Sequence, residues 1–167
     1  MNGQGDPAQL TGEICVRGEN VMTGYYKNEE ETRKVIDDEG WLHTGDLGYV
    51  DDDGFIFIKG RSKTMILGAN GKNIYPEEIE AMLNNRFAVA ESLIVHRNNK
   101  LVALVFPDAE VVRKKNIPDS ELQKLMKQHQ KVLNQRLPKY MNISAIEIVK
   151  EEFKKTPKKN IKRYLYE

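Results

Sequence analysis

Polar and apolar residues alternate at positions 13–17, between Gly12 and Gly18, which is the pattern of a half-buried β-strand. Three further runs, residues 41–43, 47–50 and 55–59, also indicate strands. The Asp-Asp-Asp-Gly sequence at 51–54 is typical of a hairpin turn between the last two runs. Asn28 directly precedes three glutamates, so we expect it to cap a short helix over 29–36. The first 60 residues are therefore predicted to be mostly antiparallel sheet.

Beyond Gly60, helical spacing appears beside strand-like runs. Pro76 stands in first-turn position ahead of a helix that continues to Leu83, with Ile79 and Met82 on its apolar face. A second, longer helix is expected from residue 120 until a proline at 138 stops it. Its apolar face recurs at three- and four-residue steps: Leu122, Leu125, Met126, His129, Val132, Leu133 and Leu137.

Further strands and a terminal helix are expected in the same part of the chain. The strands are residues 64–67, 92–95, 101–106 and 146–149, the middle two form a hairpin around 97–100, and the short helix is 160–166. This mixture predicts a compact α+β domain. The least apolar stretch, residues 60–63, is the expected junction between this domain and the strand-rich part.

The composition excludes several classes of protein. A hydrophobic content of 40% in 167 residues is enough for a buried core. The single cysteine, Cys15, has no disulfide partner, and no Cys/His cluster has metal-ligand spacing, so no metal site is predicted. No apolar run approaches the roughly 20 residues that span a bilayer, and Met1 is followed by polar residues instead of a signal-peptide core. We expect a reducing, cytoplasmic setting; peripheral membrane contact and oligomeric state stay open.

The net charge of +1 hides an uneven distribution. Residues 1–99 hold 10 Lys/Arg and 17 Asp/Glu, whereas residues 100–167 hold 16 and 8. A basic half is compatible with a non-catalytic module that binds nucleic acid, and this alternative predicts an affinity that falls with salt. The chain has no aromatic stacking strand and no nucleic-acid recognition motif, and exposed helical lysines are commonly solvated. No nucleic-acid partner is therefore expected.

Four linked motifs carry a family resemblance. They are Gly-Glu-Ile-Cys-Val-Arg-Gly at 12–18, Trp-Leu-His-Thr-Gly-Asp at 41–46, Gly-Arg-Ser-Lys at 60–63 and Gly-Lys-Asn-Ile-Tyr-Pro-Glu-Glu-Ile-Glu at 71–80. Their order resembles the adenylate-forming superfamily of AMP-forming acyl-CoA synthetases, firefly luciferase and peptide-synthetase adenylation domains. The resemblance looks closest to long-chain fatty acid–CoA ligases. It implies that residues 1–60 are the β-rich end of the large AMP-binding domain and that residues 61–167 are the α+β carboxy-terminal lid domain.

The resemblance assigns nucleotide contacts to Asp46 and Arg61. A carboxylate can accept hydrogen bonds from both ribose hydroxyls, which is the role of the aspartate in the family's Thr-Gly-Asp motif. The planar guanidinium of Arg61 suits the oxygen-rich ribose or phosphate of the adenylate. From the residues alone, Gly45-Asp46 also fits a simple turn, and Arg61 also fits an exposed salt bridge.

Alignment with the family gives three more positions. Lys63 stands at the hinge about which the lid domain swings between adenylation and thioester formation. Gly71 and Lys72 are assigned to cofactor binding, because the loop over 68–76 is brought to the acyl site and helps to shape the pantetheine channel of CoA. A surface lysine and an ordinary glycine turn have the same sequence appearance.

The match weakens at residues 156–163, near the carboxy terminus. Family members carry a Thr-Pro-x-x-Lys motif there, and its ammonium offsets the charge that builds when the carboxylate attacks the α-phosphate. Asn160 occupies the expected lysine position, and Lys159 is adjacent. We favour Lys159 as the catalytic residue through a one-residue shift. Poor adenylation and a merely solvated basic end are the alternatives.

The resemblance implies an ATP-dependent acid–thiol ligase that activates a carboxylic acid as acyl-AMP and transfers it to CoA. The implied cofactors are ATP/AMP and CoA, with Mg²⁺ in the full-length enzyme but not bound by this chain. Neither a Ser/Thr/Gly-rich phosphate loop nor a Tyr-Gly-x-Thr-Glu motif is present. The chain is therefore expected to be inactive without an amino-terminal lobe. A long-chain fatty acid is the favoured substrate, and an adenylation domain that loads a carrier protein is the rival within the same chemistry.

Overall fold

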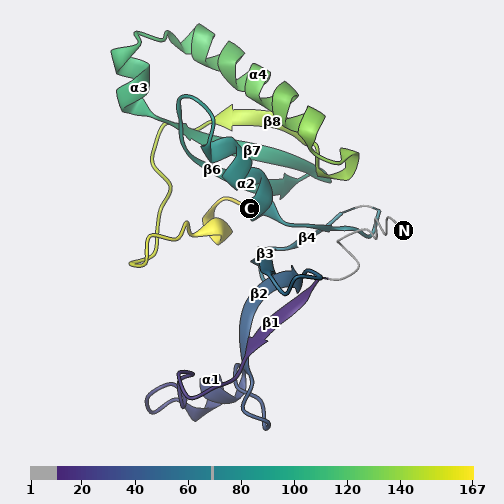
Figure 1. Cartoon of the computed structure of the whole chain (residues 1–167). Helices are drawn as coiled ribbons and strands as arrows, with labels where there is room; N and C mark the ends of the chain where they lie inside the picture. Colours follow the sequence, from purple (N-terminus) through teal and green to yellow (C-terminus); the bar gives the residue numbers. More distant parts are fainter. Residues whose placement is uncertain (1–10, 69) are drawn as a thin grey trace, which may run out of the picture. The chain divides into compact units, whose positions relative to one another are not determined.

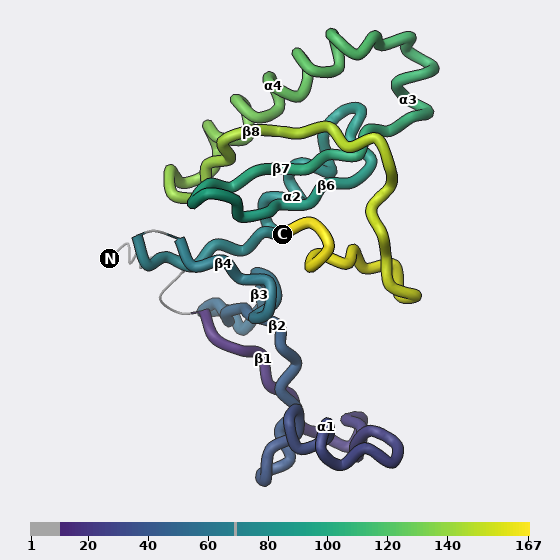
Figure 2. The backbone as a smooth tube through the Cα atoms, turned by 180° about the vertical axis from the view of Figure 1, so that it is seen from behind, coloured from purple at the N-terminus to yellow at the C-terminus, as the bar shows by residue number. Residues whose placement is uncertain are grey.

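The computed structural model describes residues 11–68 and 70–167 (Figure 1, Figure 2). The chain divides into two compact units between Met65 and Ile66. Each unit has its own sheet, and each is described by itself. The predicted segment 1–60 begins with ten residues that lie outside the described part, and the predicted 68–76 loop contains one more, residue 69.

The first unit is built on a three-stranded antiparallel sheet in the order β1-β2-β3. Its elements are β1 (Gly12–Val16), α1 (Glu29–Arg33), β2 (Leu42–Val50) and β3 (Ile56–Arg61). The Asn28 side chain accepts a hydrogen bond from the Glu31 N–H at 3.2 Å, which confirms the predicted helix cap. The helix is shorter than predicted because Ile36 pairs with Leu42 in a β-bridge instead of continuing the helix.

Strand β2 runs continuously through Thr44-Gly45-Asp46, where the sequence predicted two separate strands. Gly45 has a φ of +74°, and the register with β3 shifts between Leu47 and Gly48. Glycine adopts this left-handed backbone conformation at low cost, and a bulge bends a strand without ending it. The segment that the resemblance identifies as nucleotide-binding is therefore a distorted stretch inside a strand and not a turn.

The second unit contains a three-stranded sheet in the order β6-β7-β8. Its strands are β6 (Val89–Arg97), β7 (Lys100–Pro107) and β8 (Ile143–Ile148). Strands β6 and β7 form the predicted antiparallel hairpin, and β8 pairs with β7 in parallel. Asn98 and Asn99 form the hairpin turn with positive φ values of 48° and 61°, which asparagine tolerates better than most residues.

Each face of this sheet has its own apolar core. Two helices pack on one face: α2 (Pro76–Asn84) and α4 (Asp119–Arg136). Ile79, Leu83 and Leu133 are fully buried there. Alternate residues of β6 and β7 form the core of the opposite face, where Phe153 of the carboxy-terminal segment packs against Leu93, Val95, Val102 and Leu104. Because both faces are covered, the central strands are almost continuously apolar.

Shorter elements complete the second unit: β4 (Ile66–Leu67), β5 (Asn73–Ile74), α3 (Ala109–Lys114), and the 3₁₀ turns η2 (Lys139–Met141) and η3 (Arg163–Leu165). Helix α3 was not predicted, although Asp108 caps it by accepting from the Val111 N–H at 2.9 Å. The predicted helix at 160–166 is wrong. Ile161 pairs with Lys155 in a β-bridge, so only the last few residues form a 3₁₀ turn. The α+β fold class is confirmed.

Apolar side chains are exposed along β3 and the turn that leads into it. Phe55, Ile56 and Ile58 are 65%, 61% and 69% exposed, which is unusual for neighbouring large apolar residues. This row is a candidate contact surface for a further element of structure. Among the described residues, no helix has the length and apolar content that crossing a membrane requires.

Candidate nucleotide-contact site

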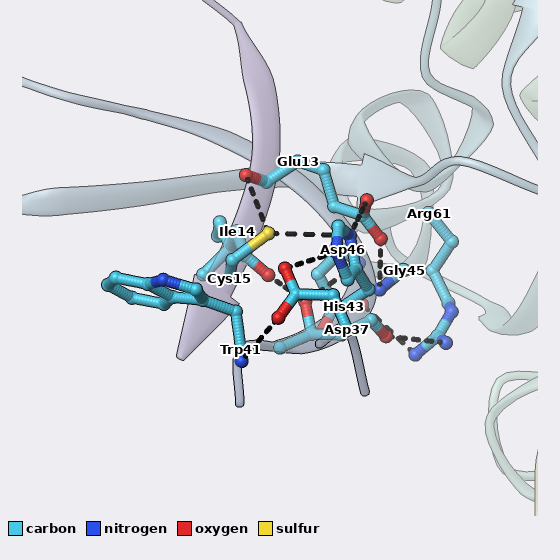
Figure 3. A network of polar contacts seen from close by, with 10 residues as sticks. Glu13, Ile14, Cys15, Asp37, Trp41, His43, Gly45, Asp46 and Arg61 are labelled. Carbon is cyan, nitrogen blue, oxygen red and sulfur yellow. Dashed lines mark hydrogen bonds and ion pairs between the residues drawn. The ribbon is translucent and has the colours of Figure 1, made fainter. Parts of the chain in front are cut away.

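Asp46 and Arg61 are paired residues on β2 and β3. The Arg61 Nη1 atom lies 3.0 Å from Asp46 Oδ1, and Arg61 Nη2 donates to the Thr44 carbonyl at 3.3 Å (Figure 3). The side chains are 32% and 55% exposed for Asp46 and Arg61, so both remain accessible from solvent. The two residues predicted to contact nucleotide are thus brought together, with the carboxylate and the guanidinium side by side.

The segment around Asp46 is fixed by hydrogen bonds to both neighbouring chain segments. Gly45 N–H donates to Glu13 Oε1 at 2.9 Å, and the Ser62 N–H donates to the Gly45 carbonyl at 2.9 Å. The Thr44 hydroxyl donates to the Ile14 carbonyl at 2.7 Å and accepts from the Asp46 N–H at 3.0 Å. These contacts hold the Asp46 backbone in one orientation, which is what a preformed ligand contact requires.

A second polar cluster, which sequence spacing did not reveal, adjoins this segment (Figure 3). His43 Nδ1 lies 2.9 Å from Glu13 Oε2 and 3.5 Å from Cys15 Sγ. On the other side of the ring, His43 Nε2 lies 3.6 Å from Asp37 Oδ2. The hydrogen bond with Glu13 raises the pKa of His43, and the same bond lowers the pKa of Glu13. Cys15 and His43 are 28 positions apart, so only the strand register brings them together.

Lys63 lies in an exposed turn immediately after β3. The Arg61 carbonyl accepts from the N–H groups of Thr64 and Met65 at 3.2 and 3.1 Å. Lys63 therefore lies just before the division between the two units, at Met65. Its assignment as a hinge stays a prediction, as do the roles of Asp46 and Arg61.

Gly71 and Lys72 lie in the tight turn between β4 and β5 in the second unit. Gly71 has a φ of +73° and donates to the Gly68 carbonyl at 2.9 Å, and Gly68 donates in turn to the Lys72 carbonyl at 2.9 Å. The Lys72 ammonium is 5.0 Å from the ring centre of Tyr140, within cation–π range.

An open cavity of about 460 Å³ adjoins this turn. Gly68 and Asn70 line it from one side, and Lys100, Lys139 and Tyr140 line it from another. Two of these side chains carry positive charge, so the cavity is suited to an anionic ligand. Its cationic residues were not singled out from sequence, because they are spread over elements that only the fold brings together.

Lys159 lies on another segment of the second unit, in the turn closed by the Lys155–Ile161 bridge. Its N–H donates to the Thr156 carbonyl at 2.9 Å, and the Thr156 N–H donates to the Asn160 carbonyl at 2.8 Å. Lys159 is exposed and has a φ of +63°, a left-handed conformation that is strained for lysine. The lysine predicted to be catalytic therefore occupies the strained position of the turn.

Arg163 anchors the same carboxy-terminal segment to α2. Its guanidinium donates to Glu80 Oε1 at 2.8 Å and also to Glu80 Oε2, and Glu80 Oε1 accepts from the Ile94 N–H at 2.7 Å. Burial raises the pKa of Glu80, and the bonds from Arg163 and Ile94 act in the opposite direction. Sequence reasoning missed this pair; a glutamate one position from the apolar face of α2 was the only local signal.

The chain is similar to CoA ligases of bacteria and plants. Residues 63–167 match the family described as AMP-binding enzyme C-terminal domain. The chain is 38% identical over 159 residues to a 2-succinylbenzoate–CoA ligase of Bacillus cytotoxicus, a match that covers 95% of this chain and 31% of that protein. It is 42% identical over 142 residues to 4-coumarate–CoA ligase 5 of Oryza sativa subsp. japonica, covering 84% of this chain and 26% of the relative.

Solved structures show the same fold. The O-succinylbenzoate coenzyme A synthetase of Bacillus subtilis, solved in complex with AMP, has a TM-score of 0.71 and 29% identity and covers 93% of this chain and 30% of that one. The adenylation domain of a carboxylate reductase from Mycobacterium chelonae has a TM-score of 0.80 at 20% identity, over 93% of this chain and 26% of that one. The chain thus spans less than a third of the length of these relatives.

Proposed function

The chain belongs to the family of AMP-binding enzyme C-terminal domains, and we propose that it is the carboxy-terminal part of an ATP-dependent acid–thiol ligase. In the proposed reaction, a carboxylate attacks the α-phosphate of ATP, which forms acyl-AMP and releases pyrophosphate. The CoA thiolate then attacks the acyl carbon and displaces AMP. The observation that carries the proposal is the Asp46–Arg61 pair on adjacent strands.

Asp46 is proposed to bind the ribose of ATP and of the acyl-adenylate. Its carboxylate accepts hydrogen bonds from the two adjacent hydroxyls, while Arg61 fixes its orientation. The guanidinium also has further donors that suit the ribose or phosphate oxygens of the same ligand. Because Gly45 and Thr44 are held by β1, the carboxylate is positioned before the nucleotide arrives.

The turn with Gly71 and Lys72 is proposed to contact CoA. Close approach to a narrow pantetheine arm is easiest where glycine leaves the backbone uncovered. Lys100 and Lys139, in the adjoining cavity, give this region the charge that suits the phosphates of CoA. Lys63 is proposed as the hinge that lets the carboxy-terminal domain, residues 61–167, serve the two half-reactions in turn.

Lys159 is proposed to act in adenylation. An ammonium near the α-phosphate offsets the negative charge of the transition state. Its place in a tight turn restricts where the side chain can point, since the backbone is fixed by the Thr156 contacts. Asn160, in the same turn, remains the position at which the family motif carries lysine.

An amino-terminal lobe is proposed to cover the exposed apolar residues of the first sheet. Ile56 and Ile58 are exposed on β3, and burying such side chains favours association by about 25 cal/mol per Å² of apolar surface. This lobe is also where the proposal assigns the ATP phosphates and the Mg²⁺ that accompanies them; no step is assigned to Mg²⁺ on this chain. The cytoplasm is proposed as the site of the reaction.

The acid substrate is proposed to be recognised outside this chain. The relatives named above act, by their names, on 2-succinylbenzoate and 4-coumarate, which are aromatic acids. We propose an aromatic acid as the first substrate to test, ahead of the long-chain fatty acid that the motifs alone favoured. Transfer to a carrier protein in place of CoA is the rival within the same chemistry.

The decisive experiment measures AMP formation by the protein joined to its amino-terminal lobe. ATP, Mg²⁺ and CoA are supplied with 4-coumarate, 2-succinylbenzoate or palmitate in parallel reactions. Acid-dependent AMP and acyl-CoA formation supports the ligase, and the preferred acid identifies the substrate class. Acid-dependent pyrophosphate release with no CoA dependence would favour the carrier-protein rival. No acid-dependent turnover of ATP with any acid would reject the proposal.

A further inference from the structure

The cluster of Glu13, Cys15 and His43 has the donor types and spacing of a transition-metal site. One ligand atom from each residue lies within 4.8 Å of the other two. Glu13 and Cys15 are on β1, and His43 is on β2, which pairs with β1. Thiolate, imidazole and carboxylate form the donor set of zinc-like ions. Cys15 and His43 face each other directly across the strand pair, so their convergence is a property of the sheet register and not of flexible loops.

The distance between sulfur and nitrogen fits a tetrahedral ion. With bonds of about 2.3 Å to sulfur and about 2.0 Å to nitrogen, such an ion holds its sulfur and nitrogen donors about 3.5 Å apart. Cys15 Sγ and His43 Nδ1 are 3.5 Å apart. Glu13 Oε2 lies 2.9 Å from the same nitrogen and within 4.8 Å of the sulfur, so it has to shift away from the nitrogen to become the third ligand (Figure 3).

Neighbouring groups contact two of the three donor side chains, those of His43 and Glu13. The Nε2 side of His43 faces Asp37 Oδ2 at 3.6 Å, slightly longer than a hydrogen bond. A small approach of the two groups would give the carboxylate–histidine–metal arrangement that fixes the ring of a ligating histidine. Asp37 is itself held by the N–H groups of Trp41 and Glu39, at 2.9 and 3.0 Å. The other oxygen of Glu13 accepts from the Gly45 N–H. Hydrogen bonds from the backbone therefore hold the carboxylates of Asp37 and Glu13 in place around His43.

We propose that Glu13, Cys15 and His43 bind one zinc-like transition-metal ion, with solvent at the fourth position. Binding forms a metal–sulfur bond and releases the thiol proton of Cys15 to solvent. The proton that His43 Nδ1 shares with Glu13 also leaves this nitrogen, to solvent or to Nε2 on the Asp37 side of the ring, so that Nδ1 and Glu13 Oε2 can bond to the ion. The side chains of Glu13 and His43 are 34% and 41% exposed, so an ion has access from solvent. The site does not depend on the ligase proposal.

The position of the site links it to Asp46. Glu13 contacts the ion with one oxygen and Gly45 with the other, and Gly45 is the residue before Asp46. Any shift of Glu13 on metal binding is therefore expected to act on the segment that carries Asp46.

The test titrates the full chain, reduced and metal-free, with Co²⁺ and follows its absorption. Because Cys15 is the only cysteine, a sulfur-to-cobalt charge-transfer band can arise only from this site. One equivalent is expected to bind with that band and to be displaced by Zn²⁺. Cys15→Ser is expected to abolish the band, His43→Gln to weaken binding at least tenfold, and Asp37→Asn to weaken it about tenfold. His96→Gln, an exposed histidine of the second unit, is the matched control and should bind as the wild type does.

Binding of Co²⁺ without a sulfur band, or equal affinity in wild type and His43→Gln, would overturn the proposal. A second measurement needs no variant: Zn²⁺ should slow alkylation of Cys15 in the wild-type chain at least tenfold. An unchanged alkylation rate at saturating Zn²⁺ would overturn it as well.

Discussion

The guanidinium of Arg163 donates to both carboxylate oxygens of Glu80, 83 positions earlier in the chain. The side chains are 19% and 10% exposed, so the ion pair is largely removed from water. Through it the carboxy-terminal segment, including the turn with Lys159, is tied to helix α2. The pair therefore connects a candidate catalytic lysine to the rigid core of the second unit.

Removing Arg163 is expected to destabilise the second unit. Arg163→Ala leaves the Glu80 carboxylate buried without its cation, which costs about 3 kcal/mol in proteins of known stability. Urea unfolding of the chain measures this loss. Lys114→Ala is the matched control, because its ion pair with Glu110 is 67% and 63% exposed and should cost less than about 1 kcal/mol. Equal losses of unfolding free energy in the two variants would show that the buried pair with Glu80 stabilises the fold no more than an exposed pair does.

Gly45→Ala is expected to damage the Asp46 site beyond its cost in stability. A Cβ at Gly45 would lie 3.2 Å from Arg61 Nη2, and the φ of +74° disfavours alanine by about 1 kcal/mol. Gly54→Ala is the control, because Gly54 has a φ of +84° but open space around its Cβ position. Both variants should lose similar stability, and only Gly45→Ala should raise the KM for ATP in the enzyme with its amino-terminal lobe. A similar KM for both would contradict the role given to this segment.

Lys159→Asn separates the charge of this lysine from the shape of its turn. Asparagine tolerates the left-handed conformation, so the turn should persist and stability should stay the same or rise slightly. Loss of the ammonium should lower the rate of ATP–pyrophosphate exchange at least tenfold while thioester formation from preformed acyl-AMP changes little. Lys158→Ala, the neighbouring surface change, should leave both rates intact.

Adding Asn160→Lys to Lys159→Asn tests which position carries the function. Recovery of exchange would show that position 160 reaches the α-phosphate, as in the family motif. Equal loss of both half-reactions in Lys159→Asn would count against any specific role in adenylation.

Ile58→Lys is expected to weaken binding of this chain to an amino-terminal lobe without changing how the chain folds. Ile58 is 69% exposed, so the substitution should change the unfolding free energy of the chain by less than about 0.5 kcal/mol. If an amino-terminal lobe covers β3, a buried lysine there should weaken binding between the separately expressed lobe and this chain. Unaltered binding measured by calorimetry would mean that the lobe packs elsewhere.

Local sequence signals predicted much of the fold. The Asn28 cap, the proline at the start of α2 and the apolar stripe of α4 are set within a few residues, and all three were found. The terminal helix was wrong because the bridge between Lys155 and Ile161 and the packing of Phe153 override local helical preference. Tertiary contacts of this kind leave no short-range pattern.

The same distinction between local signals and long-range contacts applies to the candidate site. Asp46 and Arg61 were identified through their motifs, and the structure adds that they are paired across two strands. His43 contacts Cys15 and Glu13, which are 28 and 30 positions earlier, and Arg163 contacts Glu80, 83 positions earlier. Their geometry depends on strand register and on helix packing, so no spacing rule predicts it.

The most direct test of the central claim compares ATP use by the wild-type enzyme, with its amino-terminal lobe, and by its Asp46→Ala variant. Acid-dependent ATP–pyrophosphate exchange is measured as a function of ATP concentration, with Asp53→Ala, an exposed turn residue, as the control. If Asp46 binds the ribose, its removal should cost about 2 kcal/mol of binding and reduce kcat/KM for ATP about 30-fold, while the control remains normal. Equal kcat/KM in the wild type and Asp46→Ala would contradict the account.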